Sequence, residues 1–201
     1  FTRKITDNDG LWTSLFVIGE AFAFMTTGDV ASRKRGMRSF TALESLVNVT
    51  GAYPTFPARS FCIPDTGIAG CGTESGADRW HLSTNPAFEG FVFKDDTSSD
   101  EIDGHLAALP LVYDVLASTP SEKARAYALI DGITGGIVDN DLYLIDPTTG
   151  AATSWGFWNP KDVNENPVHY SERGTNSLSM LAYLVSAYSI TGKQKYLDTF
   201  H

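Results

Sequence analysis

The stretch LWTSLFVIGEAFAFM, residues 11–25, decides how this chain is expected to fold. Its apolar residues recur at every third or fourth position, which is the spacing of one face of an α-helix. These positions are Leu11, Leu15, Ile18, Phe22 and Met25. Further apolar residues cover much of the remaining surface, namely Trp12, Phe16, Ala23 and Phe24. A helix that is apolar nearly all round is expected to be buried on most sides.

The segment that follows has a different pattern. In residues 30–47, Phe40 and Leu43 belong to a single apolar stripe, and charged residues such as Arg33 and Glu44 lie opposite it. This pattern is typical of an amphipathic helix with one face in solvent. We interpret the basic residues of this segment as part of its solvated face.

The same pair of patterns recurs twice along the chain. Residues 102–117 are apolar nearly all round, with a kink expected at Pro110, and a capping box at Thr119 and Glu122 starts an amphipathic helix. Residues 178–190 form a third predicted buried helix, after which the chain turns and starts another helix. The order is therefore inner helix, tight turn, outer helix and long loop.

This order predicts an all-α fold, an (α/α) toroid of helical hairpins in which buried helices form an inner ring. About three hairpins are present, separated by two long loops at residues 51–95 and 140–171, with one short strand predicted at 143–145. We expect residues 1–201 to be a partial toroid domain that continues beyond one or both ends. Because the tight turns share one face of the ring, the long loops and the starts of the inner helices should share the opposite face.

Five motifs resemble a family of uncharacterised secreted proteins with the six-hairpin glycosidase-like architecture. They are DNDGLWTSL (7–15), FPARSF (56–61), KDDTSSDEIDGH (94–105), WGFWNP (155–160) and ERGTNSL (172–178). The alternation of helices also resembles six-hairpin glycosidases and toroid polysaccharide lyases. The resemblance covers nearly the whole chain and implies the architecture, without implying one particular reaction.

The start of the second inner helix is rich in acidic residues. Five carboxylates fall within nine positions, at Asp95, Asp96, Asp100, Glu101 and Asp103. They repel one another unless they bind something. Three interpretations remain open: a general acid/base pair drawn from Asp96, Asp100 and Glu101, a calcium ion held between residues 95 and 101, or a solvated helix start.

His105 follows Glu101 by one helical turn. It is expected to tune that carboxylate, to act as a base itself, or to be an ordinary core histidine. At the start of the first inner helix, Asp9 is either a catalytic carboxylate or a helix cap. Trp12 is either a platform for a sugar ring or part of the core.

The third inner helix begins with polar residues that suit a glycan. Glu172, Arg173 and Asn176 are candidates to bind sugar hydroxyl or carboxylate groups, and the alternative is an internal salt bridge to the acidic cluster. The long loops add aromatic and basic side chains as candidates for substrate binding or catalysis. These are Arg59, Trp80, His81, Trp155, Trp158, His169 and Tyr170.

Composition restricts the partners and the compartment. The formal charge of −9 argues against nucleic acid and fits a neutral, hydroxyl-rich ligand. We expect no membrane-spanning segment, because no uninterrupted apolar run approaches about 18 residues.

A disulfide between Cys62 and Cys71 is favoured over two free thiols, and Asn48 begins a glycosylation sequon. Both features favour an extracellular or secreted protein.

The leading functional prediction is a glycoside hydrolase, with Asp100 or Glu101 as the acid and Asp9 as its partner. The alternative is a lyase acting on uronic-acid polysaccharides. There, Arg59, Arg173 or Asn176 would neutralise the sugar carboxylate, and the base would be one of His81, His105, His169 and Tyr170. A third possibility is a glycan-binding or structural domain without turnover.

The expected partners are an oligosaccharide or polysaccharide and the remaining hairpins, from the same chain or a partner chain. No cofactor is expected apart from the calcium ion considered above.

Overall fold

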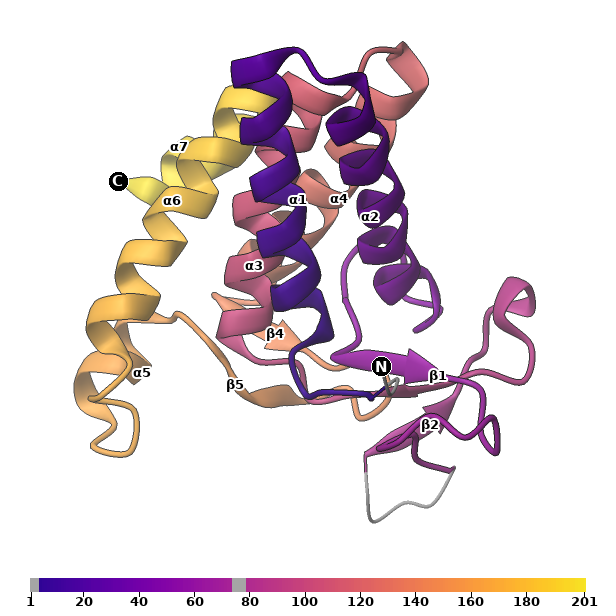
Figure 1. Ribbon diagram of the computed structural model, residues 1–201. Coiled ribbons are helices and arrows are strands. Elements are labelled where there is room, and N and C mark those ends of the chain that lie inside the picture. Colours follow the sequence, from indigo (N-terminus) through magenta and orange to yellow (C-terminus); the bar gives the residue numbers. More distant parts are fainter. Residues whose placement is uncertain (1–3, 74–78) are drawn as a thin grey trace.

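The computed structural model describes residues 4–73 and 79–201 and is mostly helical (Figure 1). The long helices are α1 (Asp9–Thr27), α2 (Val30–Asn48), α3 (Ser99–Leu111), α4 (Pro120–Asp139) and α6 (Arg173–Thr191). Shorter helices are α5 (Pro160–Glu165) and α7 (Gln194–Phe200), with a 3₁₀ turn at Pro86–Phe88. A π-helical turn, Val112–Leu116, continues α3 beyond Pro110, so the helix is irregular near the predicted kink.

Three helical hairpins pack side by side, as the sequence predicts. The pairs are α1 with α2, α3 with α4, and α6 with α7. Helix α3 lies between α1 and α6, α2 packs beside α1, and α4 packs against α3 and α6 (Figure 1). Gly28 and Gly192 end α1 and α6 in the left-handed conformation that closes a helix tightly. The described residues form a layer of hairpins, and they do not close a ring.

The core lies between the packed helices α1, α2, α3, α4 and α6. Helix α3 contributes Ile102 and Leu109, α2 contributes Phe40, and α4 contributes Leu129 and Ile133, all of them buried. The predicted capping box at the start of α4 is confirmed, since Thr119 and Glu122 satisfy each other's backbone N–H groups. The prediction that residues 102–117 form a buried helix is confirmed.

The prediction of burial on most sides is wrong for α1 and α6. Trp12 on α1 is 59% exposed and Leu178 on α6 is 70% exposed, and neighbouring apolar residues on the same sides are exposed as well. The physical reason is that no described element covers the outward side of either helix. Helix α1 also meets the length and hydropathy criteria of a membrane span, which core helices of soluble proteins and signal sequences meet too. The absence of a membrane span therefore stays a prediction.

Two small antiparallel sheets accompany the helices. Strands β1 (Ser60–Cys62), β3 (Val92–Lys94) and β2 (Trp80–Leu82) form one sheet, with β3 in the middle. Strands β4 (Tyr143–Ile145) and β5 (Ala152–Phe157) form the other. The fold is therefore not purely α: the strand predicted at 143–145 is present, but the three-stranded sheet was not expected.

The predicted disulfide between Cys62 and Cys71 is confirmed. It lies beside the three-stranded sheet, where Cys62, Trp80 and Val92 form a small apolar cluster separate from the main core. The disulfide fixes a segment with little other apolar burial, which is consistent with a secreted protein.

Candidate functional site

The starts of α1, α3 and α6 lie at one end of the hairpin layer, together with both sheets (Figure 1). The tight turn of the α1–α2 hairpin lies at the other end. This is the shared face that the order of turns and loops predicts. Polar residues that are far apart in sequence meet there.

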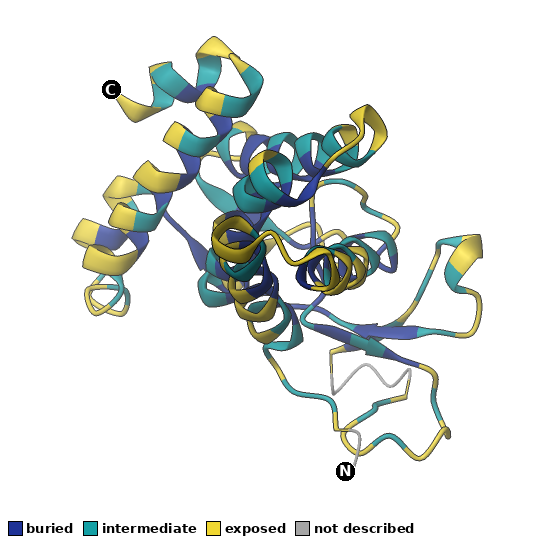
Figure 2. Ribbon diagram, turned by 45° about the horizontal axis from the view of Figure 1, so that its top comes forward, coloured by how far each residue is buried: buried dark blue, intermediate teal, exposed yellow. Residues whose placement is uncertain are grey.

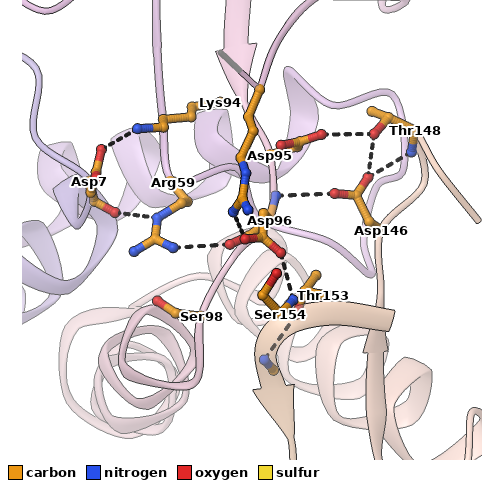
Figure 3. A network of polar contacts seen from close by, with 12 residues as sticks. Asp7, Arg59, Lys94, Asp95, Asp96, Ser98, Asp146, Thr148, Thr153 and Ser154 are labelled. Atoms are coloured by element: carbon orange, nitrogen blue, oxygen red, sulfur yellow. Dashed lines mark hydrogen bonds and ion pairs between the residues drawn. The ribbon is translucent and has the colours of Figure 1, made fainter. Parts of the chain in front are cut away.

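Arg59 joins the starts of α1 and α3. Its Nε donates to the carbonyl oxygen of Asp7 at 2.8 Å, and one terminal nitrogen donates to the carbonyl oxygen of Asp96 at 3.0 Å (Figure 3). The other terminal nitrogen donates to Asn8 Oδ1, also at 3.0 Å. Lys94, at the end of β3, adds an ion pair with Asp7 at 2.6 Å. Because all three nitrogens of its guanidinium already have acceptors, Arg59 holds the helix ends in place.

A pocket of about 300 Å³ opens beside Arg59, and we call it the Trp155 pocket. Its lining residues are Arg59, Ser98, Ser99, Asp100, Trp155 and Glu172. The side chain of Trp155, on β5, is 53% exposed. The two carboxylates come from the starts of different helices, Asp100 from α3 and Glu172 from the residue before α6.

The carboxylate of Asp100 is held in place by its neighbours. Its Oδ2 accepts a hydrogen bond from Asn8 Nδ2 at 2.7 Å, and its Oδ1 accepts one from the hydroxyl of Ser98. Glu172 is less constrained, since its carboxylate accepts only from the adjacent Ser171 hydroxyl, at 3.0 Å, among the described residues. The pocket thus offers one fixed and one adjustable carboxylate.

A second pocket, of about 370 Å³, is built around Asp96, and we call it the Asp96 pocket. Asp96 has a positive φ of 54°, which costs energy for a residue other than glycine. The side chain is fixed by the N–H of Ser154, 2.6 Å from Oδ1, and its backbone N–H donates to Asp146 at 3.1 Å (Figure 3). Arg79 forms an ion pair with the other oxygen of Asp96.

Asp95 also lines the Asp96 pocket, and this residue is buried. Its Oδ2 lies 2.6 Å from His81 Nε2 and accepts from the hydroxyl of Thr148 at 3.0 Å. Its Oδ1 is buried and has no hydrogen-bond partner in the described part of the chain. A buried oxygen without a donor is costly for the fold.

The acidic cluster does not form a metal site in the described residues. No three His, Cys, Asp or Glu side chains lie close enough together there to hold a metal ion. Instead Asp95, Asp96 and Asp100 have separate partners, namely His81, Arg79 and Asn8. The structure therefore gives no support to a calcium ion at residues 95–101.

Glu101 and His105 lie outside both pockets, in the interface between α3 and α1. Both are fully buried, and Glu101 Oε2 accepts the backbone N–H of Leu11 at 2.9 Å, so it caps α1 from the neighbouring helix. Burial raises the pKa of Glu101 to about 8 and lowers the pKa of His105 to about 4. A Cβ at Gly10 would overlap Glu101 Oε2 and lie 2.7 Å from His105 Nε2. Neither side chain can therefore contact a ligand in either pocket.

Asp9 is also not part of either pocket. Its carboxylate accepts from the backbone N–H and the hydroxyl of Thr6, at 3.1 and 2.6 Å, and burial raises its pKa. The helix-capping position belongs to Asn8, whose side chain makes no capping bond. Asp9 thus closes a local turn, and the partner carboxylate of Asp100 in the pocket is Glu172.

Several aromatic and polar candidates are buried and cannot stack on or bind a ligand directly. Trp80 packs in the disulfide cluster, and Trp158 packs edge-on against Tyr183. Asn176 donates to the carbonyl oxygen of Phe157 at 2.8 Å. Of the four tryptophans, Trp80 and Trp158 are therefore structural, and Trp12 belongs to the outward side of α1.

The remaining candidates lie near the surface but outside the two pockets. Arg173 lies over the ring of Tyr170 at 5.5 Å. His169 stacks on Phe157 at 3.8 Å and lies 2.9 Å from a carboxylate oxygen of Asp162. Asn48 ends α2 and is half-buried, so its glycosylation stays a prediction.

Asp146 has no sequence signal, because only the pairing of β4 with β5 brings it to Asp96. From its place in ERGTNSL, Glu172 was expected to bind a sugar and not to act as a catalytic carboxylate. Comparison of the chain with protein-family models, with curated proteins and with solved structures finds no match. The resemblance to six-hairpin proteins therefore rests on the sequence motifs alone.

Proposed function

We propose that this chain binds an oligosaccharide across the Trp155 and Asp96 pockets and hydrolyses a glycosidic bond. The observation that carries the proposal is the combination of an exposed tryptophan and two carboxylates in one pocket, with the carboxylates on separate helix starts. Aromatic faces pack against the C–H faces of sugar rings, and glycoside hydrolysis needs a pair of carboxyl groups.

The neighbouring Asp96 pocket is proposed as a second sugar subsite. Ser154 contributes to the Asp96 pocket and Trp155 to the other, so β5 runs along both. The polar residues that line the Asp96 pocket include His81, Thr149 and Ser154, which can bind ligand hydroxyls. These groups suit a hydroxyl-rich ligand, which the acidic balance of the chain also favours.

The proposed reaction assigns one role to each carboxylate. Glu172 gives its proton to the glycosidic oxygen, which leaves with the bonding electrons. Asp100 takes a proton from the water that attacks the anomeric carbon. Asp100 is assigned as the base because hydrogen bonds from Asn8 and Ser98 hold its carboxylate in place.

Elimination from a uronic acid has less support. A lyase needs a free cation for the sugar carboxylate, yet Arg59 is committed to three acceptors of the chain. Among the candidate bases, His105 is buried, His169 and Tyr170 lie outside the two pockets, and His81 pairs with Asp95. Arg173 is exposed, but it lies outside the two pockets.

The proposal also includes the complete fold and the cellular location of the protein. We place the three hairpins in an (α/α) toroid of the six-hairpin kind, completed by hairpins of the same chain or of a partner chain. An extracellular location is supported by the disulfide.

The test is to incubate the protein with neutral and uronic-acid oligosaccharides. New reducing ends without ultraviolet absorbance are expected, and Asp100→Asn and Glu172→Gln should each lower the rate by about 10²–10⁴-fold. Glu89→Gln is the matched control, because Glu89 is exposed and outside both pockets. Ultraviolet-absorbing products would indicate elimination instead. Binding without any product would indicate a non-catalytic glycan-binding domain.

A further inference from the structure

Helices α1 and α6, at the edges of the hairpin layer, carry exposed apolar residues. Long parts of the helical ribbons are coloured as exposed in Figure 2. On α1 they are Trp12, Leu15, Phe16, Phe22 and Met25, which are 48 to 59% exposed. On α6 they are Leu178, Leu181, Val185 and Tyr188. The three- and four-residue spacing places each set along one side of its helix, and we call the sets the α1 stripe and the α6 stripe.

The stripes contain no charge. After Asp9, the single charged residue of α1 is Glu20, which is nearly buried and forms a bond of 2.6 Å with Arg35 of α2. After Arg173, helix α6 has no charged residue at all. A solvent-facing helix surface normally carries charged or polar residues. The composition of the two stripes is therefore that of covered surfaces.

A groove of about 490 Å³ runs between α3 and α6, beside the α6 stripe. Small side chains form much of its wall, including Ala107 of α3 and Ser179, Ala182 and Ser186 of α6. Tyr183 and Asp103 are hydrogen-bonded to each other within it. A groove walled by small residues can accept bulky side chains of the kind that the α1 stripe presents.

The exposed area is large enough for a stable interface. At ~150–250 Å² per aromatic side chain and somewhat less per aliphatic one, the two stripes together expose roughly 700 Å². Each partner of a standard interface buries about 800 Å². The stripes therefore match one half of a dimer interface.

We infer that a second copy of this chain covers the stripes in a two-fold dimer. The α1 stripe of one protomer packs against the α6 stripe and the groove of its partner. A two-fold axis repeats this contact, so that the α6 stripe of the first protomer meets the α1 stripe of its partner in the same way. A membrane is the less favoured occupant, because helices that bind lipid surfaces usually carry a basic face and this chain has a net charge of −9.

The first test is the mass of the folded chain in solution by light scattering. The expected mass is twice the 21.8 kDa of one chain. Phe16→Glu and Leu178→Glu should each halve the measured mass. Val168→Glu should leave the dimer intact, because Val168 is 78% exposed but lies outside both stripes. Circular dichroism checks that each variant keeps its helices.

The second test is specific for the proposed pairing. Phe16→Cys and Leu181→Cys are made in separate chains and oxidised alone and as a mixture. The two native cysteines are already bonded to each other, so a cross-linked dimer should form mainly in the mixture. A monomer at every concentration, undefined aggregates, or dimers that Phe16→Glu does not affect would each overturn the inference. Binding to phosphatidylcholine vesicles that Phe16→Glu abolishes would assign the stripes to a membrane.

Discussion

At the scale of single residues, Glu101 shows how burial changes the role of an acidic side chain. The sequence places it in an acidic helix start, where it is a candidate for catalysis. In the structure it is fully buried, it caps α1 through Leu11, and burial raises its pKa to about 8. Sequence alone could not separate it from Asp100, because neighbouring positions of a helix point in different directions.

The raised pKa of Glu101 makes a prediction about stability. The pKa of Glu101 is about 8 in the folded protein and 4.5 is its ordinary value. The stability that its protonated form contributes is fully present below pH 4.5 and is lost as the pH rises through about 8. His105, with a pKa lowered to about 4 from 6.5, acts in the opposite direction but only below pH 6.5. Between pH 6.5 and 8 the free energy of unfolding should therefore fall, and Glu101→Gln should remove most of this fall. Urea unfolding at both pH values measures it; equal slopes for Glu101→Gln and the control Glu89→Gln would contradict the burial argument.

Gly10 is predicted to be essential for the contact between α1 and α3. Gly10→Ala would place a methyl group against Glu101 and His105, and overpacking of this kind costs about 1–3 kcal/mol. Gly19→Ala is the matched control, because nothing lies within 4 Å of a Cβ at Gly19 in the same helix. The control should be neutral or stabilise by about 0.5–1 kcal/mol. Thermal unfolding of the two variants gives the comparison, and equal melting temperatures would count against the packing described here.

At the scale of elements, the helices were predictable and the three-stranded sheet was not. The hairpins could be identified from the helical spacing of apolar residues, from the capping box at Thr119, and from the tight turns that the structure places at Gly28 and Gly192. Strands β1, β2 and β3 have three residues each, which is too short for an alternating pattern to be recognised. They are stabilised by pairing and by the disulfide, and neither is visible in a local pattern.

Arg59 is predicted to set the relative positions of α1, α3 and the loop before β1. Arg59→Lys keeps the charge but cannot reach Asp7, Asn8 and Asp96 together, because an ammonium group lacks the planar fork of donors. The expected loss is about 1–3 kcal/mol of unfolding free energy, together with weaker glycan binding. Arg38→Lys is the control, since Arg38 is exposed on α2. A stable Arg59→Lys variant with unchanged binding would show that the helix ends are held by other contacts.

At the scale of the whole molecule, the sequence predicted the shared face correctly but not the residues that line the pockets. Arg59, Asp100 and Trp155 meet in one pocket, whereas Asp9 and Trp12 lie outside it. Loop order determines which end of the hairpins a residue occupies, but only the packed structure determines which side chains are buried. For the same reason, an apolar pattern all round α1 predicted burial and could not indicate what covers its outward side.

The central claim is that the Trp155 pocket holds a sugar between Asp100 and Glu172. A crystal structure of the Asp100→Asn variant with a bound oligosaccharide tests it most directly, because the slowed reaction leaves the glycan intact. The account predicts a sugar ring against the face of Trp155, with residue 100 and Glu172 on either side of one glycosidic bond and the next sugar in the Asp96 pocket. An oligosaccharide bound elsewhere on the molecule, with the Trp155 pocket empty, would contradict it.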